Sequence, residues 1–222
     1  MKTVALLSQK GGSGKTTLAL HLAVAAERSG ISTVVVDLDP QASASGWGDS
    51  RLAETPAVVS CQAARLGAVL LAAKDGGAGL AIIDTAPHSE SAALAAARAA
   101  DLVLITCRPS ILDLRAISST IDLVKIAGKP AFAILNGVPA RGSLASEAAE
   151  AIAGYDAVVA PVHLGQRAAF SNSLTSGLVA QEYESGGKAS DEVAALFAWL
   201  ADQIGLSNHE PKTKAKPHRG AA

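Results

Sequence analysis

The feature that most constrains the fold of this 222-residue chain is the glycine-rich segment QKGGSGKTT at residues 9–17. The apolar run at residues 3–7 has the length and composition of a buried strand, and residues 16–29 have those of a helix. Glycines at a strand-to-helix turn let backbone N–H groups converge on phosphate oxygens, and the helix N-terminus adds partial positive charge. The segment therefore predicts a phosphate-binding loop and a nucleotide triphosphate site.

The loop matches the G-x-x-x-x-G-K-[ST] pattern except that Gln9 replaces the first glycine. We expect Lys15 to reach the terminal phosphates and the Thr16 hydroxyl to bind Mg²⁺. The residues expected to contact the nucleotide are Gly11, Gly12, Ser13, Gly14, Lys15, Thr16 and Thr17. Lys10 is an additional lysine outside the pattern, and its place beside a loop built for anions favours a functional role over that of an ordinary surface lysine.

Short apolar runs alternate with longer alanine-rich runs along the chain. Strands are predicted at residues 3–7, 33–38, 57–61, 80–84, 102–106, 131–135 and 157–161. Helices are predicted at residues 16–29, 62–74, 89–99, 112–126, 144–153 and 191–204. This alternation predicts an α/β fold, a single-domain P-loop NTPase with a mostly parallel, twisted sheet that helices cover on both faces. The loops at the carboxyl ends of the strands then form one ligand-binding edge.

Charge is nearly balanced over the whole chain, with a formal net charge of −1, so there is no general attraction to nucleic acid or membrane. Positive charge gathers near the C-terminus, where Lys212, Lys214, Lys216 and Arg219 lie in a polar segment broken by prolines. We expect one folded domain over residues 1–206 and a basic, disordered tail over residues 207–222.

Cys61 and Cys107 lie in apolar segments far apart in the sequence, which indicates buried, reduced thiols rather than a disulfide or a metal site. The N-terminal apolar run is too short for a secretion signal, and no stretch is long enough to span a bilayer. We therefore expect a soluble cytoplasmic protein.

Two of the predicted strands end in carboxylates. Asp37 and Asp39 follow one apolar run and Asp84 ends another. Unpaired negative charge at the end of a buried strand is unfavourable, so we expect a cation nearby, either Mg²⁺ or a lysine of the loop. Asp84 has the position of an acid that holds the metal through water, opposite Thr16. Two solvated aspartates at a strand end are the alternative for Asp37 and Asp39.

Lys10, the phosphate loop, the D-x-D-P-Q run that begins at Asp37, and Asp84 together resemble the deviant Walker A ATPases of the ParA and MinD group. The resemblance covers residues 1–206, which would form the ATPase domain. It implies a homodimer that depends on ATP and Mg²⁺, in which Lys10 reaches the nucleotide of the partner subunit. It also implies that Asp37 serves the metal and phosphate network and that Asp39 places or activates the attacking water. The implied catalytic residues are Lys10, Lys15 and Asp39.

Two later segments extend the resemblance. Asn136 follows a strand predicted late in the chain. In the family, an asparagine at this position recognises adenine, and an amide offers both a hydrogen-bond donor and an acceptor to the edge of a base. A turn asparagine before Gly137 is the alternative. Arg167 matches an arginine that, in small ParA proteins, contributes to DNA binding independent of sequence. A plain surface arginine is the alternative, although a dimer would double such contacts along the phosphates.

The resemblance implies a small partition ATPase without an N-terminal helix-turn-helix domain. Such a protein binds double-stranded DNA nonspecifically as an ATP-bound dimer on the nucleoid, and a ParB-like partner on a plasmid or chromosome stimulates its slow hydrolysis. A protein cargo, such as a chemosensory array or a microcompartment, is an alternative that the sequence leaves open.

Two other hypotheses fit less well. A MinD-like membrane-cycling ATPase would need a basic amphipathic helix near its end, whereas the polar residues of 191–204 include Asp191, Glu192 and Asp202, which anionic lipids would repel. A metabolic or metal-inserting P-loop enzyme would need cysteine ligands, and Cys61 and Cys107 have no C-x-x-C partner.

Overall fold

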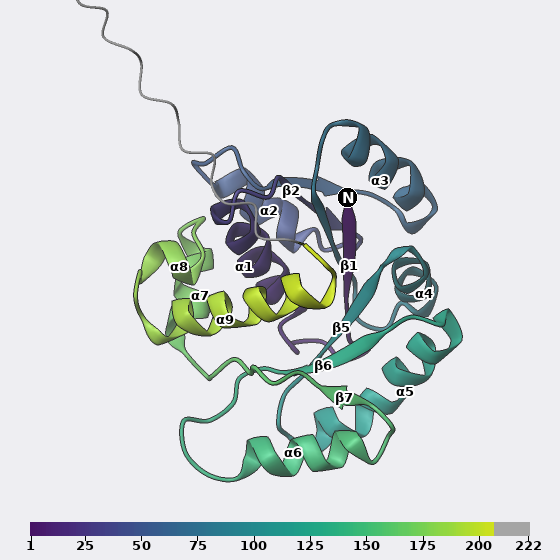
Figure 1. Cartoon of the computed structure of the whole chain (residues 1–222), viewed down its shortest axis with the longest axis vertical. Coiled ribbons are helices and arrows are strands. Elements are labelled where there is room, and N and C mark those ends of the chain that lie inside the picture. Colours follow the sequence, from purple (N-terminus) through teal and green to yellow (C-terminus); the bar gives the residue numbers. More distant parts are fainter. Residues whose placement is uncertain (207–222) are drawn as a thin grey trace, which may run out of the picture.

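The computed structural model describes residues 1–206, so the tail predicted at residues 207–222 lies outside the described residues. Seven strands form one sheet in the order β3-β2-β4-β1-β5-β6-β7, and every strand pair is parallel (Figure 1). The strands are β1 (Lys2–Leu7), β2 (Thr33–Asp37), β3 (Ala57–Ser60), β4 (Leu80–Asp84), β5 (Leu102–Cys107), β6 (Ala131–Leu135) and β7 (Val158–Val159).

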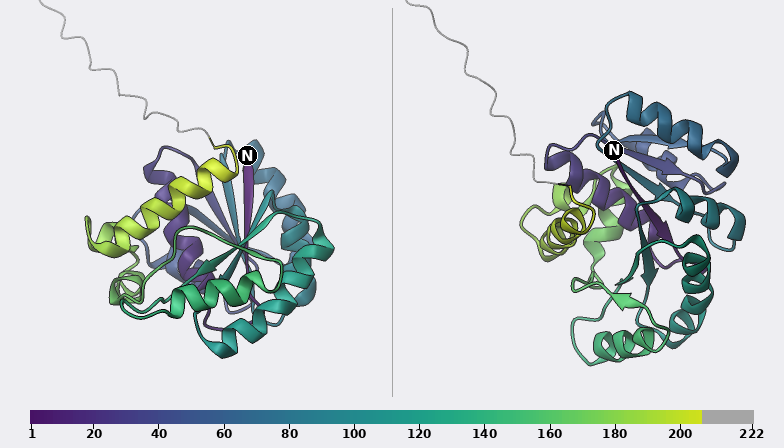
Figure 2. Two further views of the ribbon diagram at one scale, coloured as in Figure 1. Left: turned by 60° about the horizontal axis from the view of Figure 1, so that its bottom comes forward. Right: turned by 45° about the vertical axis from the view of Figure 1, so that its right-hand side comes forward.

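Helices cover both faces of this sheet (Figure 2). One face packs against α1 (Lys15–Arg28), α2 (Ser43–Ser50), α7 (Ala168–Thr175), α8 (Ala180–Tyr183) and α9 (Lys188–Gln203). The other packs against α3 (Leu66–Asp75), α4 (Glu90–Ala99), α5 (Ile111–Ala127) and α6 (Leu144–Ala153), and the short 3-10 helix η1 (Ala63–Arg65) precedes α3. The predicted fold class is therefore confirmed.

The central strand β1 shows why the sheet must be covered on both sides. Val4 and Leu6 contribute to the core under α1 and α9, whereas Ala5 and Leu7 contribute to the core on the opposite face. Successive side chains of a strand point to opposite faces, so a continuous apolar run needs an apolar partner on each.

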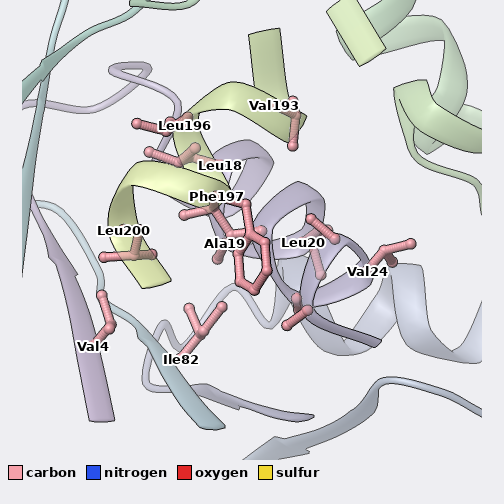
Figure 3. Packing of buried hydrophobic residues seen from close by; sticks show 14 of the residues in the cluster. Val4, Leu18, Ala19, Leu20, Val24, Ile82, Val193, Leu196, Phe197 and Leu200 are labelled. Carbon is pink, nitrogen blue, oxygen red and sulfur yellow. The ribbon is translucent and has the colours of Figure 1, made fainter. Parts of the chain in front are cut away.

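Helix α9 carries an apolar stripe on one face. Val193, Leu196, Phe197 and Leu200 are buried and lie against α1 and the sheet (Figure 3). The stripe therefore serves the core. No helix within residues 1–206 is long and apolar enough to cross a membrane.

Three short helices, α2, α7 and α8, were not among the sequence predictions, and the predicted last strand is reduced to the two residues of β7. The prediction for the cysteines was half right. Cys107 is buried, but Cys61 is only partly buried because it follows the edge strand β3. Burial raises the pKa of both thiols, that of Cys107 to about 12, which favours the unreactive protonated form.

Candidate nucleotide-binding site

The phosphate loop joins β1 to α1 at the carboxyl edge of the sheet. Gly12 and Gly14 have φ values of 75° and 94°, a left-handed conformation that disfavours residues with a Cβ. A Cβ on Gly14 would also lie 2.0 Å from Nδ2 of Asn136. Gly14 is the N-cap of α1, so the loop delivers the N-terminus of that helix to the edge where an anion would bind.

Lys15 is the first residue of α1, and its side chain turns back toward β1. The residue is 6% exposed, and its ammonium donates to the carbonyl of Ser8 at 3.2 Å. Burial lowers the pKa of Lys15, while the nearby carboxylates of Asp84 and Asp39 act in the opposite direction. A buried ammonium near these carboxylates and at a helix N-terminus is suited to bind a phosphate.

The parallel register places two of the predicted acids side by side. Asp37 is paired with Asp84 at the ends of β2 and β4, and both are fully buried. The Thr16 hydroxyl donates to Asp84 Oδ2 at 2.6 Å, and Asp84 Oδ1 is buried without a hydrogen-bond partner among the described residues. Burial raises the pKa of Asp84 to about 7. An unpartnered carboxylate oxygen beside a threonine hydroxyl suits Mg²⁺ or one of its waters, so the predicted metal ligands fit this ion.

Asp37 has a further role that the sequence did not suggest. Its Oδ1 accepts a hydrogen bond from Asp39 N at 3.0 Å, and its Oδ2 accepts one from Ser45 N at 3.1 Å. The carboxylate therefore fixes both the loop that carries Asp39 and the first turn of α2. Asp39 is only partly buried and lines a separate cavity of about 770 Å³ with Pro87 and other residues of the β2 and β4 loops.

Lys10 does not extend freely from the loop. Its ammonium lies 2.8 Å from Asp113 Oδ2, near the N-terminus of α5. Lys10 is 34% exposed and Asp113 is 8% exposed. Asp113 also accepts a hydrogen bond from the hydroxyl of Ser110, the N-cap of α5. The chain therefore holds its additional lysine with a carboxylate 103 positions away.

Asn136 lies directly on the phosphate loop. Its Nδ2 donates to the carbonyl of Ser13 at 2.8 Å, and the Ser13 hydroxyl is 2.8 Å from that of Thr106. One donor of the amide is thus used to brace the loop, while the residue also lines a pocket of about 400 Å³ beside it. That pocket is lined by Gly14, Thr17, Arg108, Pro109, Ser110, Asn136, Gly137, Pro139, Gly165, Gln166, Arg167, Phe170 and Ser171.

Arg167 is the N-cap of α7 and lines the same pocket. Its guanidinium pairs with Glu192 of α9, with Nε 3.0 Å from Oε1 and 3.1 Å from Oε2, and its Nη2 also donates to Oε1. The structure therefore brings Arg167 near the loop but gives its charge an intramolecular partner.

The site includes residues that sequence reasoning did not single out. Asp113 has no role in the sequence analysis, and Glu192 appears there only as part of an acidic helix face. Ser45 falls in a helix that was not predicted. Asp113 and Glu192 act through contacts with residues 103 and 25 positions away, and no local pattern signals such contacts.

The sequence is similar to known nucleotide-binding proteins. The family described as the CobQ/CobB/MinD/ParA nucleotide binding domain matches residues 4–179. The chain is 28% identical to Protein IncC of Escherichia coli over 262 residues, which covers 93% of this chain and 71% of IncC. It is 40% identical over 123 residues to Maintenance of carboxysome distribution protein A of Gloeobacter kilaueensis, which covers 54% of this chain and 55% of that protein.

Solved structures share the fold at low sequence identity. The septum site-determining protein MinD of Pyrococcus horikoshii, complexed with Mg-ADP, superimposes with a TM-score of 0.74 at 18% identity, and the match covers 92% of this chain and 98% of that one. The ATP complex of a variant of McdA from Cyanothece gives a TM-score of 0.70 at 17% identity, over 92% and 96% of the two chains.

Proposed function

The chain belongs to the CobQ/CobB/MinD/ParA nucleotide-binding family, and from this membership we propose that it is an ATPase that dimerises around ATP and partitions or positions a cargo. The observation that carries the proposal is the cluster at the carboxyl edge of the sheet. There the Thr16–Asp84 pair, with its unpartnered carboxylate oxygen, lies beside the buried Lys15 and the N-terminus of α1.

ATP would place its phosphates in the loop and its nucleoside half in the adjoining pocket. Backbone N–H groups of residues 11–17 and the ammonium of Lys15 would bind the phosphates. Thr16 directly, and Asp84 through water, would hold Mg²⁺, which neutralises phosphate charge during phosphoryl transfer. Asn136 would fix the loop through Ser13 and offer its remaining polar groups to the base.

Hydrolysis would require the second subunit. Asp39, held in place by the Asp37 carboxylate, would place or activate the attacking water. Lys10 would leave Asp113 and reach the phosphates of the nucleotide in the partner subunit. Because each Lys10 starts in an ion pair within its own subunit, dimerisation competes with that pair.

We further propose that the ATP-bound dimer binds double-stranded DNA nonspecifically, on the nucleoid, and that a ParB-like protein stimulates hydrolysis. The match of Arg167 to the DNA-contacting arginine of small ParA proteins supports this. Residues 1–206 would form the ATPase domain, and the basic residues 207–222 would form a tail that adds to DNA affinity. Truncation after Leu206 tests the tail, because an inert extension would leave DNA affinity and its salt dependence unchanged.

A protein cargo is the second candidate. The chain is 40% identical, over about half its length, to a protein named for carboxysome distribution, which favours positioning of a protein assembly over the membrane-cycling alternative. Burial of the α9 stripe also leaves that helix without a free apolar face for lipid. Liposome co-sedimentation with ATP tests the membrane alternative, and pull-down with a candidate cargo adaptor separates the two kinds of cargo.

Retention on DNA in the presence of different nucleotides tests the leading proposal. We expect retention with ATP or a non-hydrolysable analogue, loss of retention with ADP, and loss in Lys10→Ala. Lys74→Ala is the matched control, because Lys74 is exposed at the end of α3, away from the site. Equal retention with and without nucleotide, or equal behaviour of the two variants, would contradict the proposal.

A further inference from the structure

The segment between β7 and α7 forms one wall of the pocket beside the phosphate loop. Gly165, Gln166 and Arg167 all line this pocket. On one side the segment is tied to the chain after β6, because Val138 N donates to Leu164 O at 3.0 Å and Gln166 N donates to Val138 O at 2.8 Å. Backbone pairing therefore fixes the start of the wall.

A single side chain from α9, that of Glu192, also holds this segment. Glu192 accepts a hydrogen bond from Gly165 N at 3.0 Å through Oε2, and both of its oxygens accept from the guanidinium of Arg167. A Cβ on Gly165 would lie only 3.0 Å from Nη2 of Arg167, so the guanidinium packs closely on the backbone of the wall. Glu192 and Arg167 are 20% and 27% exposed, respectively.

The pocket adjoins the start of α1 and not the residues expected at the terminal phosphates. It reaches the phosphate loop at Gly14 and Thr17, while Lys10, Lys15 and Asp84 are not among its lining residues. A ligand whose phosphates lie in the loop would therefore extend its ribose and base, rather than its terminal phosphates, toward the wall that carries Arg167.

We propose that Glu192 is a positioning residue for nucleotide binding, which acts by fixing Gly165 and Arg167 as the wall for the base and ribose. This inference rests on the proposed function, since it takes a nucleotide as the ligand of the pocket. A planar guanidinium held by two carboxylate oxygens has one orientation, so less side-chain entropy is lost when a ligand packs against it. Arg167 is then a nucleotide-pocket residue in addition to its proposed role at DNA.

The test is a set of affinities measured by titration calorimetry for MgADP and for magnesium tripolyphosphate, which lacks the nucleoside. We expect Glu192→Ala to raise the Kd for MgADP about three- to tenfold, the range that one net hydrogen bond confers, and to leave the Kd for tripolyphosphate unchanged. Glu192→Gln keeps an acceptor oxygen and should have a smaller effect. Asp191→Ala is the control, since Asp191 is exposed on the same helix and makes no side-chain hydrogen bond or ion pair within residues 1–206.

A double-mutant cycle distinguishes a positioning role of Glu192 from a general loss of stability. If Glu192 acts through Arg167, the rise in the Kd for MgADP in Arg167→Ala/Glu192→Ala should be clearly smaller than the product of the two single rises. Multiplicative effects would overturn the inference, as would an unchanged Kd in Glu192→Ala, equal weakening of ADP and tripolyphosphate, or an equal effect of Asp191→Ala. Failure of the wild-type protein to bind MgADP would instead refute the proposed function.

Discussion

The ion pair between Lys10 and Asp113 predicts that removal of one carboxylate strengthens dimerisation. Each subunit must release Lys10 before the ammonium can reach the partner's nucleotide. The pair joins a buried carboxylate to an ammonium that is 34% exposed, so solvent screens it and it is worth about 1 kcal/mol. A dimer breaks two such pairs, so about 2 kcal/mol opposes association, which corresponds to about thirtyfold in the dimer Kd. Asp113→Asn should therefore tighten the ATP-dependent dimer by about thirtyfold.

Sedimentation equilibrium with a non-hydrolysable ATP analogue measures this constant directly. Asparagine keeps an acceptor for the Ser110 hydroxyl, so the start of α5 should be preserved. Asp122→Asn is the matched control, because Asp122 is an exposed aspartate on the same helix. The reasoning is refuted if the two variants dimerise equally, or if Asp113→Asn weakens the dimer while its thermal stability stays that of the wild type.

Three further predictions concern stability and the loop. Burial lowers the pKa of His21 to about 4, below its value of about 6.5 in the unfolded chain. The contribution of the neutral imidazole to the free energy of unfolding is therefore intact above pH 6.5 and is lost as pH falls toward 4. Because of this residue, the free energy of unfolding measured with urea should be about 2 kcal/mol lower at pH 5 than at pH 7, and His21→Gln should remove that difference. Arg51→Ala should lower the free energy of unfolding by about 3 kcal/mol, because it leaves the Glu182 carboxylate without a guanidinium that now lies 2.6 Å away. Gly14→Ala should weaken binding of a fluorescent ATP analogue by about tenfold or more, since the left-handed φ and the contact with Asn136 both exclude a Cβ.

The parts of the fold that could be predicted from sequence depend on local patterns. Continuous apolar runs identify β1, β2, β4, β5 and β6 because each strand is buried on both faces. Glycines and a lysine between a strand and a helix identify the phosphate loop. The clustering of the acids at the strand ends could also be predicted, because parallel strands bring their carboxyl ends to one edge of the sheet.

Helix α2 shows why other parts could not be predicted. Its sequence, SASGWGDS, combines serines and glycines that have low helix propensity. It forms because Ser45 N donates to the buried Asp37 carboxylate and because Trp47 is buried, with its Nε1 donating to Leu178 O at 3.1 Å. The contact of Trp47 joins segments 131 positions apart, and tertiary packing here overrides local preference.

Three cations of the candidate site, Lys10, Lys15 and Arg167, share a property that no local pattern reveals. Each of the three already has an intramolecular acceptor. Lys15 donates to the carbonyl of Ser8, Lys10 pairs with Asp113, and Arg167 pairs with Glu192. A partly exposed ion pair is worth about 1 kcal/mol, whereas micromolar nucleotide binding is worth about 8 kcal/mol. The intramolecular pairs can therefore fix the side chains in the absence of nucleotide without preventing their transfer to phosphate groups.

The different contacts of Lys15 and Lys10 predict an order of events. Lys15 and the loop amides meet the nucleotide within one subunit, so their rearrangement needs no partner. Lys10 gains a phosphate only when a second subunit supplies one, and so its pair with Asp113 opposes association and not the first binding step. Nucleotide binding should consequently precede dimerisation, and a variant that loses Asp113 should change the second equilibrium while leaving the first unaltered.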